Sequence, residues 1–189
     1  MKNEEYVIKR NGQKECISFD KILTRVKKLG GNDLSVNYTS LVQKIIDRLY
    51  DEIPTTKIDE LMAEQCASMA STHPDYTKMA SAITISNLQK NTSSSFYETI
   101  KKLYDFKDVN NEAYKLIHED IMSLCETYKE TLDFMIDYQR DFLFDYFGFK
   151  TLERAYLMKV NNVIVERPQH MWMRVSLTIH GSNMEKVKE

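Results

Sequence analysis

The chain has 189 residues, of which 42% are hydrophobic, and its formal net charge is −2. This size and apolar content predict a folded core in one domain or two small ones, and the near-neutral charge argues against a nucleic-acid partner. No apolar run approaches the ~20 residues of a membrane span, and the N-terminal residues MKNEEY lack the apolar core of a signal peptide. We therefore expect a cytoplasmic protein without a membrane partner.

Cysteine and histidine spacing gives no support for a metal site or for catalysis. Cys16, Cys66 and Cys125 never form a C-x-x-C pair, so neither a disulfide framework nor a structural zinc site is expected. The four histidines show no H-x-H or H-E-x-x-H spacing, and no G-x-S-x-G elbow is present. We assign no metal ligand and no catalytic residue. Five glycines and three prolines favour a helix-rich fold.

Residues 6–28 are predicted to form a β-hairpin followed by a helix. Tyr6 to Ile8 are β-forming, Asn11-Gly12 suits a two-residue turn, and Cys16-Ile17 closes the return strand. Ser18 occupies the N-cap position, and Gly30-Gly31 is typical of a helix end. The apolar positions that we expect on one face of this helix are Phe19, Ile22, Val26 and Leu29.

Positive charge is concentrated in this stretch. Residues 1–28 hold eight Lys and Arg against four acidic residues, a local balance of +4. One interpretation is an ordinary solvated face. The other is that Lys9, Arg10 and Lys21 form a pocket for a polyphosphate, in which each charge-assisted hydrogen bond contributes roughly 1.5–3 kcal/mol. No Walker loop occurs in the sequence, so such a site is of another kind, and spacing alone leaves both interpretations open.

Three further helices are predicted in the first half. Leu41, Ile45 and Leu49 mark one that Pro54 ends, and residues 56–59 approximate a capping box for the next, in which Ile58, Leu61, Met62, Gln65 or Cys66, and Met69 are expected to be buried. The last of the three starts near Tyr76 and has Lys90 near its end. Residues 1–93 then form one hairpin and four helices, with the boundary placed in the polar segment 91–95.

Residues 94–189 are predicted to be helical as well. The aromatic-rich residues 142–149 are expected to form a core or an anchor between elements rather than an aromatic cage for a ligand, because so many aromatic side chains rarely lie exposed together. Asn161-Asn162 predicts a second hairpin, and Pro168 opens a helix that ends at Gly181. This helix is apolar on most sides, so we expect that it pairs with another chain or that the polypeptide lacks its next segment. The predicted fold class is mainly α with small β-hairpins (α+β).

Several strings resemble one known family. YVIKRNGQKECISFDKI, THPDY, SNLQK, DYFGFKTLERAYL and ERPQHMWMRVSLTIH are similar to the N-terminal region of the eukaryotic-type class I ribonucleotide reductase large subunit. The resemblance covers essentially the whole chain, and its last two strings are long and specific. It implies an ATP-cone, the domain that carries the overall activity site, in residues 1–93. Residues 94–189 would be the helical region that leads toward a barrel absent from this sequence.

The resemblance also implies a set of nucleotide-binding residues. The paired basic residues on the first strand match Lys9 and Arg10, Thr55 matches the threonine before the third helix, and Lys90 matches a distal lysine. Asp59 matches the aspartate whose loss in the family removes feedback inhibition. The segment that wraps the nucleotide comprises Glu15, Cys16, Ile17, Ser18, Phe19, Asp20 and Lys21.

In this family ATP supports activity and dATP inhibits it, so the implied effectors are ATP and dATP with Mg²⁺. The implied protein partners are other large subunits and the small radical-generating subunit. ATP and dATP differ only in the 2′-hydroxyl, and one buried hydrogen bond, about 1–3 kcal/mol, suffices to discriminate between them.

The catalytic cysteines and substrate loops of the family lie in the barrel, so the chain alone is not expected to reduce ribonucleotides. It then corresponds to a truncated product, one piece of a split gene or a partial sequence. The alternatives are a non-catalytic module that associates with a complete large subunit, and a remnant without a role. A free-standing ATP-cone repressor would need a zinc ribbon with C-x-x-C pairs, which this sequence lacks.

Overall fold

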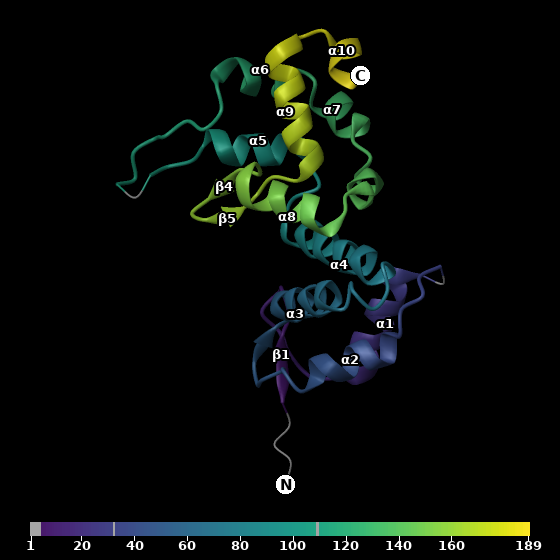
Figure 1. Ribbon diagram of the computed structural model, residues 1–189. Coiled ribbons are helices and arrows are strands. Elements are labelled where there is room, and N and C mark those ends of the chain that lie inside the picture. The colour runs from purple at the N-terminus through teal and green to yellow at the C-terminus, as the bar shows by residue number, and fades with distance from the viewer. Residues whose placement is uncertain (1–4, 32, 109) are drawn as a thin grey trace. The chain divides into compact units, whose positions relative to one another are not determined.

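The computed structural model describes residues 5–31, 33–108 and 110–189, which form two compact units (Figure 1). The first unit comprises the described residues up to Asn87 together with Phe144–Phe149, and the second comprises Leu88–Leu143 and Lys150–Glu189. Each unit has its own hydrophobic core. The domain boundary near residue 93 stays a prediction.

The first unit contains a three-stranded sheet in the order β2-β1-β3. β1 (Tyr6–Ile8) pairs antiparallel with β2 (Lys14–Cys16) and parallel with β3 (Ile53–Pro54). The predicted hairpin is thus confirmed, but β3 was not predicted. Its two residues are too few to show any periodicity, and its partner strand lies more than forty residues earlier in the sequence.

The connection between β1 and β2 differs from the predicted two-residue turn. The amide of Gly12 donates to the carbonyl of Lys9 at 2.9 Å, and the amide of Lys9 donates to the carbonyl of Gln13 at 2.8 Å. In this loop Gly12 takes a positive φ of 80°, whereas Asn11 does not. The two-residue turn with two positive φ angles is therefore wrong, because a longer turn with a single left-handed glycine connects the strands.

Four helices follow the predicted order: α1 (Phe19–Gly30), α2 (Tyr38–Ile46), α3 (Thr55–Ser68) and α4 (Asp75–Asn91). The Ser18 hydroxyl caps α1 by accepting the amide proton of Lys21, and Gly31 ends the helix at a φ of 63°. α2 ends before Leu49. The capping box at residues 56–59 is wrong, since the N-cap of α3 is Pro54 and no side chain caps it.

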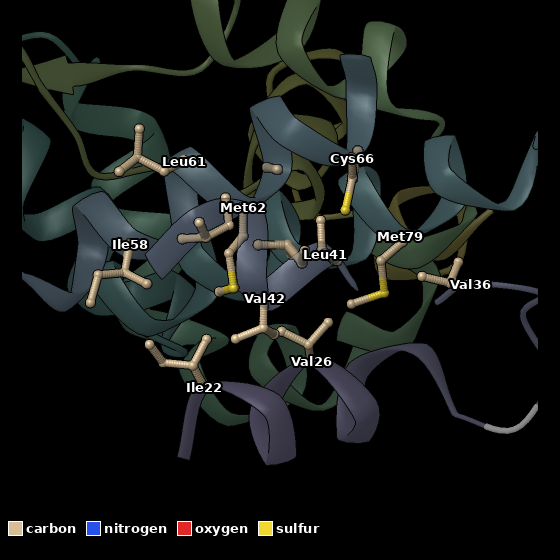
Figure 2. Close-up of a cluster of buried hydrophobic side chains, with 14 of the residues drawn as sticks. Ile22, Val26, Val36, Leu41, Val42, Ile58, Leu61, Met62, Cys66 and Met79 are labelled. Carbon is tan, nitrogen blue, oxygen red and sulfur yellow. The ribbon is translucent and has the colours of Figure 1, made fainter. Parts of the chain in front are cut away.

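Side chains from all four helices and the sheet converge in the core of the first unit. Figure 2 shows Ile22 and Val26 of α1, Leu41 and Val42 of α2, several residues of α3 and Met79 of α4 in this cluster. Val26, Leu41 and Met79 are completely buried. Complete burial of such a side chain contributes roughly 1.5–3 kcal/mol, which fixes α1 and α3 beside the sheet.

The second unit is predominantly helical. It contains the end of α4, α5 (Phe96–Tyr104), α6 (Glu119–Thr127), α7 (Lys129–Met135), a 3₁₀-helix (Tyr138–Leu143), most of α8 (Tyr146–Ala155), α9 (Pro168–His180) and α10 (Met184–Lys188). Its hairpin, which was predicted, joins β4 (Lys159–Val160) to β5 (Val163–Ile164), and Asn161 and Asn162 both take positive φ. The predicted fold class is confirmed.

The aromatic-rich residues 142–149 form the predicted anchor only in part, with Tyr146 packed against the core of the first unit. Phe149 is completely buried, but Phe142 and Phe147 are exposed. The run passes from the end of the 3₁₀-helix into the first turn of α8, so successive side chains point in different directions. A high local aromatic content therefore does not place the whole run in one core.

Candidate nucleotide site

The sheet places two of the predicted site residues on one face. Glu15 of β2 lies directly opposite Val7 of β1, and Lys9 follows two residues after Val7. Because side chains alternate along a strand and directly paired residues share a face, Lys9 and Glu15 project to the same side. The Nζ atom of Lys9 lies 3.3 Å from Oε2 of Glu15.

A second lysine reaches the same carboxylate from the first turn of α1. The Nζ atom of Lys21 donates a hydrogen bond of 2.5 Å to Oε1 of Glu15. This hydrogen bond holds the pKa of Glu15 below its usual range, and Lys9 adds to the effect while partial desolvation opposes it. Two ammonium groups thus converge on one carboxylate, and the side chains of Lys9 and Lys21 remain 37% and 64% exposed.

Asp59 forms the centre of a second ionic cluster. Its side chain is only 2% exposed and lies in the second turn of α3. Arg25 of α1 donates to both carboxylate oxygens, from Nε to Oδ1 at 2.7 Å and from Nη2 to Oδ2 at 2.8 Å. Arg10 approaches Oδ2 at 3.2 Å, and its Nη2 also donates to Oδ1 of Asn87 at 2.5 Å. The buried carboxylate is therefore compensated by two arginines.

The register of the third strand places Thr55 beside Lys9 at one end of the sheet. β3 runs parallel to β1, with Ile8 opposite Pro54. Lys9 and Thr55 are the next residues on the two neighbouring strands, so they leave the sheet at the same end. Thr55 is also the first residue of α3, whose N-terminal amides have no side-chain cap. Such a helix N-terminus favours an anion, because its free N–H groups carry partial positive charge.

The remaining members of the predicted wrapping segment differ in environment. Ile17 and Phe19 pack against the core of the first unit, and Ser18 caps α1. Cys16 and Asp20 are exposed. The segment therefore fixes the start of α1 by packing and capping while it leaves polar groups on the surface.

Lys90 lies in the last turn of α4, where its residue is exposed. That end of the helix belongs to the second unit, whereas Lys9 and Arg10 belong to the first. The role of Lys90 in the site stays a prediction.

Two members of the Asp59 cluster, Arg25 and Asn87, were missed by sequence reasoning. Arg25 lies four residues after Lys21 on α1, so the two share a helix face, and this spacing was an available signal. For Asn87 no such signal exists, because α4 is assigned to the cluster only by the tertiary fold. The spacing of residues 56–59 also places Asp59 in a local capping box, and that pattern gives no indication of its long-range partners.

The second unit contains a buried polar cluster of its own. Nε2 of His170 lies 2.6 Å from the hydroxyl of Tyr138, and Arg167 stacks over the Tyr138 ring at 4.4 Å. His170 is completely buried, and its Nδ1 atom has no hydrogen-bond partner among the described residues. Burial lowers the pKa of His170 to about 3, and the charge of Arg167 acts in the same direction. The imidazole is therefore neutral in the folded chain near neutral pH.

Two parts of the chain match known protein families. Residues 5–91 match the ATP cone domain, and residues 142–189 match the ribonucleotide reductase all-alpha domain. The basic hairpin, α1, α3 and α4 thus all lie within the residues that match the ATP cone domain. The chain is similar over nearly its whole length to ribonucleoside-diphosphate reductase large subunits, which confirms the resemblance read from the sequence.

Individual large subunits are similar over nearly the whole chain. The protein of Plasmodium falciparum is 46% identical over 185 residues, which cover 97% of this chain and 23% of that protein. The Dictyostelium discoideum protein is 45% identical over 186 residues, covering 95% of this chain and 21% of that protein. The Variola virus protein is 43% identical, covering 97% and 24%. The chain thus spans less than a quarter of the length of these relatives.

No helix in the described parts of the chain combines the length and the apolar content needed to cross a membrane.

Proposed function

We propose that the first unit binds ATP or dATP as alternative effectors and so regulates ribonucleoside-diphosphate reduction in the cytoplasm. ATP is the activator in this proposal and dATP the inhibitor. The complete enzyme then supplies deoxyribonucleotides for DNA replication, and it includes the rest of the large subunit and a small radical-generating subunit. The membership of residues 5–91 in the ATP cone family supports this role.

The observation that carries the proposal is the convergence of Lys9 and Lys21 on Glu15. Both ammonium groups are partly exposed, at 3.3 and 2.5 Å from one carboxylate, so an incoming polyphosphate can take over their hydrogen bonds. The uncapped N-terminus of α3 lies at the same end of the sheet as Lys9 and offers further donors. The Mg²⁺ ion of this proposal accompanies the nucleotide and needs no cage of protein ligands.

Phosphate contacts give affinity but no discrimination, because ATP and dATP carry the same phosphates. Discrimination then rests on the 2′-hydroxyl, where one buried hydrogen bond is worth about 1–3 kcal/mol, or roughly ten- to a hundredfold in affinity. For regulation, the two nucleotides must also favour different states of the assembly.

Calorimetric titration of the full chain with Mg-ATP and with Mg-dATP tests the proposal. The wild-type chain is expected to bind saturably, and the double substitution Lys9→Ala with Lys21→Ala is expected to weaken binding by at least about tenfold. The matched control is Lys27→Ala with Lys28→Ala, which removes the same charge from exposed positions of α1. The proposal fails if neither nucleotide binds saturably, or if both double variants bind like wild type.

A second candidate function is association with a complete large subunit, and the surface of α9 favours it. Trp172, Val175 and Ile179 lie at i, i+3 and i+7 and are all exposed, so one face of α9 presents an apolar stripe. Such a stripe is characteristic of a surface that another protein segment covers. The corresponding measurement is the mass of any complex that the chain forms with a full-length large subunit.

A further inference from the structure

Asp59 is held unequally by its two arginines. Arg25 uses two different nitrogens on two different oxygens, at 2.7 and 2.8 Å, which is the fork geometry of a strong ion pair. Arg10 approaches a single oxygen at 3.2 Å and shares the same nitrogen with Asn87. All four residues belong to the first unit. Arg25 therefore forms the stronger of the two ion pairs that compensate the charge of Asp59.

This inequality determines which arginine can leave. A carboxylate that is 98% buried must keep a counter-charge, because an unpaired buried charge is strongly unfavourable. With Arg25 in place, departure of Arg10 still leaves Asp59 with a complete two-point ion pair. Without Arg25, Arg10 becomes the one arginine of the described cluster that can neutralise Asp59.

We propose that Arg25 is a positioning residue of the nucleotide site: by neutralising Asp59 it allows Arg10 to exchange the carboxylate for a nucleotide phosphate. The inference rests on the proposed function of the first unit. It adds a role for a residue on α1 that itself need not contact the ligand. Arg10 is suited to the exchange because its side chain is 27% exposed, so a ligand can reach its guanidinium.

The same contacts would also fit a purely structural role for Arg25, and the two roles predict different affinities for the folded Arg25→Gln variant. If Arg25 acts through Arg10, Arg25→Gln leaves Asp59 to hold Arg10, and Mg-ATP binds about 10- to 100-fold more weakly. Replacing Asp59 by Asn in the Arg25→Gln variant removes the carboxylate charge that holds Arg10 away from the nucleotide phosphate. Affinity then returns to within about threefold of the Asp59→Asn single variant. A purely structural role predicts instead that Arg25→Gln, where it folds, binds Mg-ATP like wild type.

The experiment is calorimetric titration of the full chain with Mg-ATP, with folding of each variant checked by circular dichroism. The variants are Arg25→Gln, Asp59→Asn, their combination, and Arg25→Lys. Arg25→Lys keeps the counter-charge without the fork, so we expect it to bind Mg-ATP more tightly than Arg25→Gln and less tightly than wild type. Arg48→Gln is the matched control, since Arg48 lies 3.8 Å from Glu64 in an exposed ion pair of the same unit.

The inference is overturned if Arg25→Gln binds Mg-ATP like wild type, or if the double variant stays as weak as Arg25→Gln. Where Arg25→Gln does not fold, Arg25→Lys and the double variant decide, and failure of either to bind when folded overturns it. A wild-type chain that binds no nucleotide is a different result, because it refutes the proposed function itself.

Discussion

Arg25 and Asp59 join α1 to α3 through a two-point ion pair, with distances of 2.7 and 2.8 Å between their nitrogen and oxygen atoms. The carboxylate is almost fully buried, whereas the guanidinium is partly exposed. The pair therefore has two consequences for the first unit, one for nucleotide binding and one for stability, and they are measured separately.

The stability consequence follows from the buried charge. Removing one partner of a buried pair typically costs about 3–5 kcal/mol when the other charge is left without compensation. Arg10 still contacts Asp59 when Arg25 is removed, so we expect Arg25→Ala to lower the free energy of opening of α3 by a smaller amount, about 1.5–3 kcal/mol, as measured by hydrogen exchange of its amides in the full chain. Arg48→Ala breaks an exposed pair, 3.8 Å from Glu64, and is expected to change it by ~0–1 kcal/mol. An equal loss of opening free energy in the two variants would contradict a stabilising role of the buried Arg25–Asp59 pair.

Local sequence signals predicted the local parts of this fold. Ser18 and Gly31 delimit α1, and Asn161-Asn162 forms a turn with two left-handed residues, because capping and turn chemistry involve near neighbours. Lys9 and Lys21 were also found from sequence, since a local excess of charge marks them. Whether they bind a nucleotide could not be decided from spacing.

The parts that sequence reasoning missed depend on long-range contacts. β3 has two residues and is defined by its pairing with β1, which no periodicity reveals. Asp59 fits a local capping box by spacing, but its carboxylate pairs with Arg25, 34 residues earlier in the chain. A buried ion pair outweighs a weak cap, so the tertiary contact determines the side chain's position. The prediction for residues 142–149 held only in part for a related reason, because the burial of each aromatic side chain depends on the direction in which it projects from its helix.

The three cysteines are expected to differ sharply in reactivity. Burial raises the pKa of Cys66 to about 12, and the pKa of Cys125 rises to about 12 mainly through burial, with Asp133 and Glu126 contributing. The reactive species is the thiolate, so both thiols are inert at pH 8. Cys16 is exposed. Titration with a thiol reagent at pH 8 should modify one thiol in the native chain and three in denaturant.

A Cys16→Ser variant supplies the control, because it should lose the native reaction and keep the two thiols that appear on unfolding. Cys16 also lies beside Glu15 on β2, so bound nucleotide should slow its modification. Rapid reaction of two or more thiols in the native chain would contradict the burial of Cys66 and Cys125.

Stability of the second unit is expected to fall in mild acid because of His170. Its pKa is about 3 in the folded chain and near 6.5 when unfolded, so between these values the unfolded state binds a proton that the folded state does not. The free energy of unfolding then falls as pH decreases below about 6.5, by at most about 1.4 kcal/mol per pH unit. Urea unfolding at a series of pH values measures this free energy for the second unit when it is followed by the fluorescence of Trp172, the chain's single tryptophan.

The difference between wild type and His170→Gln isolates this effect from other groups. Gln keeps a polar atom near the Tyr138 hydroxyl but does not titrate, so the variant should show a flatter pH dependence between pH 6.5 and 5. Asp141, whose pKa is raised mainly by burial, acts with the opposite sign in both proteins and cancels in the comparison. His180→Gln changes an exposed histidine of the same helix and should leave the slope unchanged. An identical slope in wild type and His170→Gln would contradict the prediction.

The exposed apolar stripe of α9 predicts a specific dependence of assembly on three side chains. Trp172, Val175 and Ile179 share one face of the helix, whereas Met171, Met173 and Leu177 are buried within the second unit. A charge placed on the stripe must be desolvated when another protein covers it, so it opposes association without disturbing the buried face. We therefore expect Val175→Asp and Ile179→Asp to prevent association with a full-length large subunit while the chain stays folded.

Light scattering of the chain mixed with a full-length large subunit, with and without dATP, gives the mass of any complex. The wild-type chain should increase that mass, and each stripe variant should not. Val163→Asp is the matched control, because Val163 is an exposed valine of β5 outside α9, and it should associate like wild type. An unchanged mass for the wild-type chain in both conditions contradicts the association. Equal association of all variants assigns the contact to a surface other than the stripe, because the introduced charge would then remain in water.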